Sequence, residues 1–282
     1  MLADIGQHKK NMGTARDTLQ QKLDADEDIV KVRAPIANPK LPEGHEFADL
    51  EMIEPHTLIA YMWNEIGMNI PEESVKAFWN HHRAVNSPWM ENFSSVSDLH
   101  IPLGLYGDGA RARQLAFQPV EKVLGIFISL PLFRPKSTRN SRWCIFSINE
   151  NLLYGRKTLN AIFRRIVWSL NHLFTGLWPS HGPDNEPLNS PRAGQKFTDA
   201  GHRWALCELR GDWVYQKQVL GFNSSWTAGV NKSVCFRCKA LGRGDCRTQY
   251  YHVHGDNAHS FGREYNLVSF LLNEMPANDI CT

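Results

Sequence analysis

The sequence has no long hydrophobic run, no strong charge of either sign and few cysteines. Its longest mainly apolar stretch, residues 123–133, contains Pro131 and is well short of the roughly 20 apolar residues that a membrane-spanning helix needs. The net charge is +2, from 31 Lys and Arg against 29 Asp and Glu, so bulk charge does not by itself indicate a nucleic-acid partner. The amino-terminal residues lack the basic-then-apolar pattern of a secretory signal. We therefore expect a soluble, intracellular protein that does not associate with membranes.

The six cysteines are expected to be reduced thiols or metal ligands, because disulfides are rare in an intracellular protein. A CxxC pair in a Cys-rich loop over residues 235–254 is the start of a possible tetrahedral zinc site. The candidate ligands are Cys235, Cys238, Cys246 and His252. Four protein ligands leave no open position, so such a zinc ion would be structural; two free thiols in a turn are the alternative. Cys144 and Cys207 lie within apolar segments and are expected in the core.

Composition divides the chain into three parts. Hydrophobic residues make up 42% and charged residues 21%, which is ordinary globular usage. Residues 1–50 are rich in charge, Pro and Gly, and predict a flexible arm. Residues 51–97 predict a small helical unit, with one helix ending near Gly67 and a second beginning at Pro71. His81 and His82 fit the polar end of that second helix better than a metal or base site.

Residues 98–282 predict an α/β core. Three segments alternate or run apolar as strands do, at 101–106, 123–133 and 142–148. Residues 155–176 carry apolar side chains every three or four positions and predict an amphipathic helix, and residues 202–212 predict a fourth strand. The order strand, strand, strand, helix, strand is that of the ribonuclease H-like fold, a mixed sheet flanked by helices. In that fold the fourth strand lies beside the first.

An aspartate follows the first and the fourth predicted strands. Asp108 lies in "YGDGARAR" and Asp212 in "ELRGDW", so the expected pairing would bring the two carboxylates together. Carboxylate oxygens are the ligands that Mg²⁺ and Mn²⁺ prefer. The alternatives are structural, because an Asp beside Gly also suits a tight turn and Asp212 suits a helix N-cap.

The segments "YGDG", "LNAIFRRIVWSLNHLF", "ELRGDW" and "VCFRCKA", in this order, resemble blocks of DDE transposases of the plant CACTA (En/Spm) type, and more closely transposase-like proteins of protist genomes. The resemblance covers about residues 98–240. It implies metal-assisted phosphoryl transfer on DNA in the nucleus, with Asp108 and Asp212 as catalytic metal ligands. The family also needs a third carboxylate on a later helix. The candidates for it are Asp256, Glu264 and Glu274.

The absence of a clear third carboxylate leaves two functional hypotheses. One is a Mg²⁺- or Mn²⁺-dependent transposase or nuclease, active or degenerate. The other is a noncatalytic module that binds nucleic acid or protein and carries a structural zinc loop. Basic side chains around the first three predicted strands are candidate phosphate contacts, with a solvated rim as the alternative. They are Arg111, Arg113, Arg134, Lys136, Arg139 and Arg142.

Overall fold

The structure is a computed structural model that describes residues 29–85, 90, 95–113, 121–133, 141–212, 215–216 and 219, with the backbone alone for 111–113 and 121. This part of the chain forms an α/β fold with a six-stranded mixed sheet and three α-helices. The sequence prediction of an α/β protein with a mixed sheet flanked by helices is confirmed at this level. No helix in the described ranges is long and apolar enough to cross a membrane.

The sheet has the strand order β1-β2-β5-β4-β3-β6. All neighbouring strands are antiparallel except β3 and β6, which are parallel. The strands are β1 (Ile29–Ala37), β2 (His45–Ile53), β3 (His100–Arg113), β4 (Glu121–Ser129), β5 (Arg142–Asn149) and β6 (Arg203–Gly211). The predicted pairing of the strand that contains Asp108 with the strand that precedes Asp212 is therefore confirmed.

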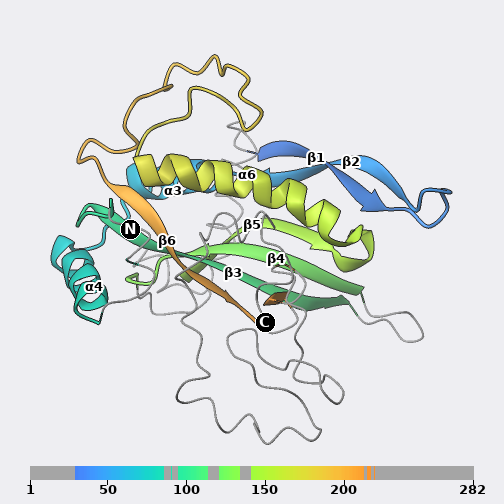
Figure 1. The fold of residues 1–282 in the computed structure, drawn as a ribbon, viewed down its shortest axis with the longest axis horizontal. Coiled ribbons are helices and arrows are strands. Elements are labelled where there is room, and N and C mark those ends of the chain that lie inside the picture. Colours follow the sequence, from blue (N-terminus) through green and yellow to red (C-terminus); the bar gives the residue numbers. More distant parts are fainter. Residues whose placement is uncertain are drawn as a thin grey trace, which may run out of the picture.

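Helices cover the sheet unequally. The helices are α3 (Pro55–Asn64), α4 (Glu72–Ala84) and α6 (Gly155–Thr175), with a short 3₁₀ turn, η2 (Glu150–Leu152), before α6. The long helix α6 runs across the sheet with α3 beside it, whereas α4 lies on the other side, near the start of β3 (Figure 1). Parallel neighbours need a crossover connection, and α6 is the α-helix in the connection between β5 and β6.

The long helix forms where the apolar periodicity predicts it. Its buried side chains recur on one stripe, as a helix packed on a sheet requires. They include Leu159, Ile162, Phe163, Ile166, Val167 and Leu173. The helix ends at Gly176, which takes a left-handed conformation with φ of 76° and donates its backbone N–H to the carbonyl of His172. A glycine adopts this conformation without the cost that a Cβ would add.

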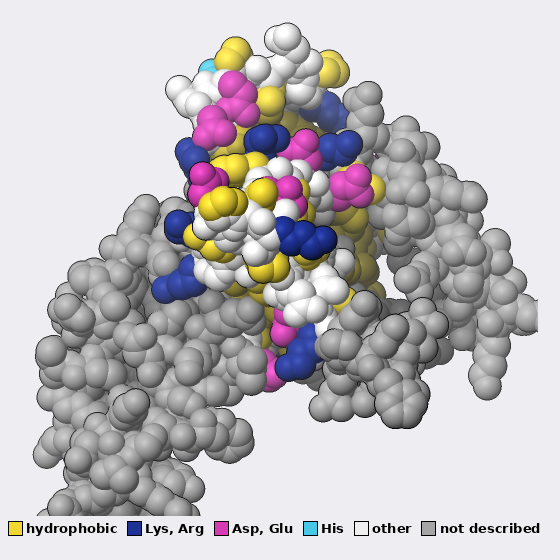
Figure 2. Space-filling view, turned by 90° about the vertical axis from the view of Figure 1, so that its right-hand side faces the viewer, with side chains coloured by type: hydrophobic (Ala, Val, Ile, Leu, Met, Phe, Trp, Pro, Cys, Tyr) yellow, Lys and Arg dark blue, Asp and Glu magenta, His cyan; other side chains and the backbone are white. Residues whose placement is uncertain are grey.

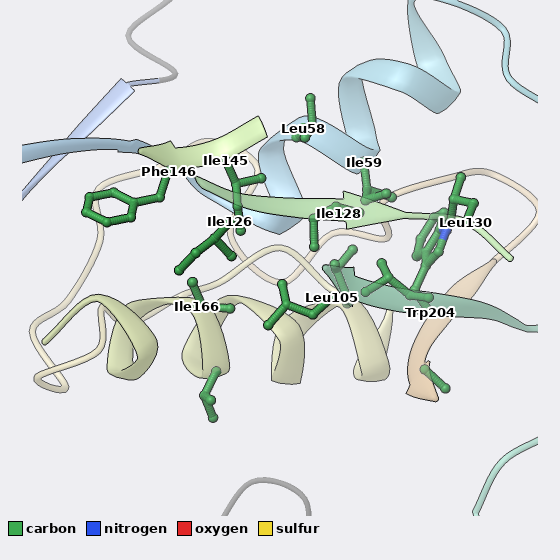
Figure 3. Close-up of a cluster of buried hydrophobic side chains, with 14 of the residues drawn as sticks. Leu58, Ile59, Leu105, Ile126, Ile128, Leu130, Ile145, Phe146, Ile166 and Trp204 are labelled. Atoms are coloured by element: carbon green, nitrogen blue, oxygen red, sulfur yellow. The ribbon is translucent and has the colours of Figure 1, made fainter. Parts of the chain in front are cut away.

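The core lies between α6 and the sheet. Ile166 of α6 points toward Leu105 of β3 and Ile126 of β4, and Leu58 and Ile59 of α3 belong to the same cluster (Figure 3). All five belong to one cluster of buried hydrophobic side chains. A register shift between Ile126 and Phe127 lets two consecutive β5 residues, at positions 145 and 146, both be buried. The helices of the predicted unit at 51–97 thus share their core with the sheet.

The prediction of a flexible arm over residues 1–50 is wrong for residues 29–50. These residues form most of a hairpin in which β1 and β2 pair from Ile29↔Ile53 to Ala37↔His45. The average composition hides the alternation that builds it: Val30 and Val32 pack against the core, while Lys31 and Arg33 are exposed. Pro35 is tolerated because β1 is an edge strand, where a missing N–H breaks no ladder.

Removing the side chain at the centre of the core should cost much of the fold's stability. Ile166→Ala is expected to lower the free energy of unfolding by about 3 kcal/mol, because it removes buried apolar surface and leaves a cavity. Urea unfolding followed by circular dichroism measures this. The exposed Arg164→Ala on the same helix is the control and should change stability by less than about 0.5 kcal/mol; equal losses in both variants would contradict the packing described.

Candidate functional site

The parallel pairing of β3 and β6 places Asp108 beside Asp212. The last registered pair of the two strands is Gly107↔Gly211, and each aspartate is the next residue of its chain. Asp108 and Asp212 are 104 positions apart in the sequence (212 minus 108). Because neighbouring strands are about 4.8 Å apart, the pairing makes these two residues neighbours. Asp108 lies within β3, paired with Gly125 of β4; the alternative that it forms a tight turn is wrong.

The two glycines of this pair make room for Tyr215. A Cβ added to Gly107 would lie 1.8 Å from Cε2 of Tyr215, and one added to Gly211 would lie 2.2 Å from its Cδ1. The Tyr215 ring therefore lies directly on the backbone of both strands, and its burial raises the pKa of the phenol. Because successive side chains of a strand point to opposite faces, Asp108 points away from this ring.

Asp212 has the structural role expected of an N-cap. Its Oδ1 accepts the backbone N–H of Tyr215 at 2.7 Å, and its carbonyl accepts the backbone N–H of Gln216 at 3.0 Å. The aspartate itself is exposed at the end of β6. The cap positions Tyr215 against the two glycines, so one carboxylate contributes both to the local fold and to the candidate site.

Asp108 belongs to a polar group on the sheet face turned away from α6. We call this face the distal face and define it by Tyr106, Asp108, Phe127 and Arg142. The Tyr106 hydroxyl donates a hydrogen bond of 2.6 Å to Oδ2 of Asp108, and the Arg142 guanidinium lies 3.7 Å from the centroid of the Tyr106 ring. Phe127, the cross-strand partner of Tyr106, has its ring centroid 5.9 Å away.

The two aspartates suit a hard divalent cation. Mg²⁺ is commonly held by one or two carboxylates and keeps several waters, so two neighbouring aspartates are a sufficient protein contribution. Oδ1 of Asp108 accepts no hydrogen bond from any described residue, which leaves it available. Within the described ranges there is no group of three or more His, Cys, Asp or Glu side chains arranged around a common point. The candidates for a third ligand, Asp256, Glu264 and Glu274, lie outside the described residues.

Another carboxylate on the distal face is already paired. Glu208 of β6 lies opposite Gly104 in the register, and it forms an ion pair with Arg210 at 2.5 Å. It is four residues before Asp212 along the same strand, too far along an extended chain to share a cation with that residue. Glu208 is therefore part of the surroundings of the site and is not a ligand candidate.

The other predicted site residues divide by position. Arg142 is exposed on β5, and the backbones of Arg111 and Arg113 belong to β3. Beyond the described residues lie three of the basic candidates and all the zinc candidates: Arg134, Lys136, Arg139, Cys235, Cys238, Cys246 and His252. At the end of the molecule that Figure 2 shows, basic and acidic side chains are interspersed, so this side offers no uniform basic surface.

The predictions for two histidines and two cysteines outside the candidate site have different outcomes. His81 and His82 lie in the last turn of α4, as expected of a polar helix end. Cys207 is mostly buried, and burial raises the pKa of its thiol. Cys144 is exposed, so the prediction that it is a core residue is wrong. The bulge in β5 explains this, because the extra residue Ile145 is buried beside Phe146 and leaves Cys144 opposite Phe127 of the distal face.

The structure also contains a buried polar network that the sequence analysis missed. Ser169 of α6 accepts the backbone N–H of His56 at 2.9 Å, and its hydroxyl lies 2.8 Å from Nδ1 of that histidine. Nε2 of His56 lies 3.6 Å from Oε2 of Glu54, which is ion-paired with Arg165. The one feature of the sequence that could have indicated this network is a serine, Ser169, on the apolar stripe of a helix.

This Ser–His–Glu arrangement resembles a nucleophile with its base, but it is closed to substrate. Glu54, His56 and Ser169 are 6%, 3% and 0% exposed. Ser169 instead satisfies a backbone N–H in the first turn of α3, a group that a helix leaves unpaired. Burial, assisted by the positive charges of His172 and Arg165, lowers the pKa of His56 to about 3. The network joins α3 to α6 and carries no catalytic role.

Comparison of the chain with protein-family models, with curated proteins and with solved structures found no match. The functional argument therefore rests on the residues and geometry described above.

The low pKa of His56 predicts loss of stability in mild acid. An unfolded histidine has a pKa near 6.5, so between that pH and about 3 the unfolded chain binds a proton that the folded chain excludes. The free energy of unfolding should fall as the pH falls through this window, by about 2 kcal/mol at pH 5. Urea unfolding at pH 7 and pH 5 measures the change.

The variant His56→Gln is the control for this titration. It removes the proton acceptor, so its loss of stability between the two pH values should be smaller than that of the wild type by about the same amount, ~2 kcal/mol. Equal losses in both proteins would show that His56 is not responsible.

Proposed function

We propose that the protein is a transposase-derived enzyme that performs metal-assisted phosphoryl transfer on DNA. The observation that carries the proposal is the register Gly107↔Gly211, which makes Asp108 and Asp212 neighbours at two parallel strands. The order β5-β4-β3-β6, with α6 as crossover, supports a ribonuclease H-like core extended by the β1–β2 hairpin. DNA as the substrate and a nuclear location follow from the sequence resemblance.

The two carboxylates have the same proposed task, to hold Mg²⁺ or Mn²⁺ through their free oxygens. When bound, such a cation activates a water or a 3'-hydroxyl and stabilises the charge that develops on the phosphate. Asp212 is fixed by its capping bond to Tyr215, and Asp108 by its hydrogen bond with Tyr106. Both are therefore oriented before a cation arrives, which lowers the entropic cost of binding it.

Arg142 is the basic candidate best placed to contact the DNA backbone. Its guanidinium stacks on Tyr106, two residues from Asp108 along β3, and its side chain is exposed. A stacked guanidinium keeps its N–H edge available, and this edge matches the geometry of a phosphate. The distal face therefore combines a proposed cation site with a phosphate contact.

A noncatalytic module that binds nucleic acid is the second candidate function. The observation that favours it is that both aspartates also have structural partners, Tyr106 and the Tyr215 backbone. Zinc in the Cys-rich loop would be structural under either function. The two candidates differ in whether the aspartates bind a divalent cation.

Calorimetric titration with Mn²⁺ tests the cation site. We expect the wild type to bind Mn²⁺ at millimolar concentration and both Asp108→Asn and Asp212→Asn to lose this binding. Asparagine keeps an oxygen that accepts the hydrogen bond from Tyr106 or caps Tyr215, so the folds should be preserved. Loss of binding therefore reports the charge and not the local structure.

Asp184→Asn is the matched control for this experiment, because Asp184 is an exposed aspartate paired with Arg164 of α6 at 2.8 Å, away from the distal face. It should bind Mn²⁺ as the wild type does. A wild type that does not bind Mn²⁺, or aspartate variants that bind it equally well, would exclude the proposed enzyme and leave the binding module.

The contribution of Arg142 can be measured as DNA affinity. For Arg142→Ala we expect weaker binding of a single-stranded oligonucleotide and a salt slope smaller by about 1, because one phosphate contact is lost. Fluorescence anisotropy at several salt concentrations measures both quantities. Arg164→Ala removes an arginine of α6 that already has an acidic partner and should leave both unchanged. An unchanged slope in Arg142→Ala would remove this residue from the DNA contact.

A further inference from the structure

The hydrogen bond between Tyr106 and Asp108 is short and made to a carboxylate. Its length of 2.6 Å is typical of an O–H donor to an ionised acceptor, and such bonds are roughly twice as strong as neutral ones. The two residues are two positions apart on one strand and so point to the same face. The phenol reaches along β3 to the carboxylate, and this is a contact that β-strand geometry permits but does not require.

The Tyr106 ring is held on two sides. The Arg142 guanidinium lies 3.7 Å from its centroid, a distance typical of stacking of a cation on an aromatic ring. Across the ladder, Phe127 is tilted at 51° to it, with centroids 5.9 Å apart. The Phe127 ring leans over Gly125, since a Cβ there would be 2.6 Å from its Cε2. The contacts with Arg142 and Phe127 fix the position of the Tyr106 ring and so of the phenol oxygen.

A fixed phenol fixes the carboxylate that accepts from it. Asp108 stands between two glycines, Gly107 and Gly109, so the residues next to it in the chain have no side chains that restrict its rotation. The hydrogen bond supplies that restriction: it holds Oδ2 of Asp108 on the phenol and leaves Oδ1 as the oxygen available for a cation. In general, a hydrogen bond to a metal-ligating carboxylate orients it, and loss of that bond lowers the affinity for the metal.

We propose that Tyr106 is a positioning residue for the cation site: its hydroxyl orients Asp108 so that Oδ1 faces the cation shared with Asp212, and Arg142 and Phe127 hold its ring in place. The inference rests on the proposed function, because it concerns the same site. It adds two residues to that site, Tyr106 and Phe127, that the sequence analysis did not single out.

The test is the Mn²⁺ affinity of Tyr106→Phe, measured by calorimetry. This variant keeps the ring, and so the contacts with Arg142 and Phe127, and removes only the hydroxyl. Loss of a hydrogen bond behind a metal ligand typically costs 10- to 100-fold in metal affinity, so we expect binding weaker by roughly tenfold or more. The thermal unfolding midpoint, recorded without Mn²⁺, checks that the variant is folded.

Tyr154→Phe is the matched control. Tyr154 is also half-buried, and its ring is held by stacking on His45 with centroids 4.5 Å apart, but its hydroxyl makes no hydrogen bond to a described residue. Its removal should leave the Mn²⁺ affinity unchanged. If Tyr106→Phe and Tyr154→Phe both weaken Mn²⁺ binding equally, the inference is overturned, because the loss of affinity would then not depend on the hydrogen bond to Asp108.

The outcomes separate this inference from the function on which it rests. If the wild type binds Mn²⁺, Asp108→Asn abolishes binding and Tyr106→Phe binds as tightly as the wild type, then the cation site stands and the positioning role is wrong. If the wild type does not bind Mn²⁺, both are overturned. Weaker binding in Tyr106→Phe alone, with an unchanged unfolding midpoint, supports the positioning role.

Discussion

The parallel pairing of β3 with β6 is the constraint on which the rest of the structure depends. Two strands can run in parallel only if the chain between them crosses over, and here α6 lies in the last part of that chain, between β5 and β6. The same helix supplies the apolar stripe that closes the core. This connection therefore contributes both to the core and to the parallel pairing that makes Asp108 and Asp212 neighbours along the sheet.

The backbone at the end of this pair is unusually close to a side chain. Gly107 and Gly211 leave a surface on which the Tyr215 ring lies, and Asp212 holds Tyr215 there through its capping bond. A side chain larger than hydrogen at either glycine would displace the ring. The candidate site is thus supported from the core side of the sheet, while its polar groups lie on the distal face.

The two faces of the sheet have different tasks. On the side of α6, isoleucine, leucine and phenylalanine side chains are almost fully buried, and the polar network around His56 joins α3 to α6. On the distal face, Tyr106 donates a hydrogen bond to Asp108, and Arg142 stacks on the Tyr106 ring. Strand alternation separates the two sets, since neighbouring residues of β3 serve opposite faces.

The sequence was informative where a pattern is local. The helix at 155–176 and its end at Gly176 follow from apolar periodicity and a glycine stop, and the structure has α6 at Gly155–Thr175. The hairpin at 29–53 was missed because prolines and charges lower the average hydrophobicity of strands that bury only one face. β3 was expected to end before Asp108, whereas it continues to Arg113 because β4 offers a partner along that length.

The candidate site shows the same division. The sequence by itself determined the order of the elements from β3 to β6, and with it the expectation that Asp108 and Asp212 lie at the ends of strands that pair. The sequence also offered the cap at Asp212, which is a local contact. Only the tertiary structure decided that Tyr106 donates to Asp108 and that Arg142 stacks on Tyr106. The physical reason is the distance along the chain over which each effect acts. Periodicity and turn propensity act over a few residues. The contacts of Tyr106 and Arg142 depend instead on the register of β3 against β4 and β6 and on the bulge in β5, and packing of the whole sheet sets both.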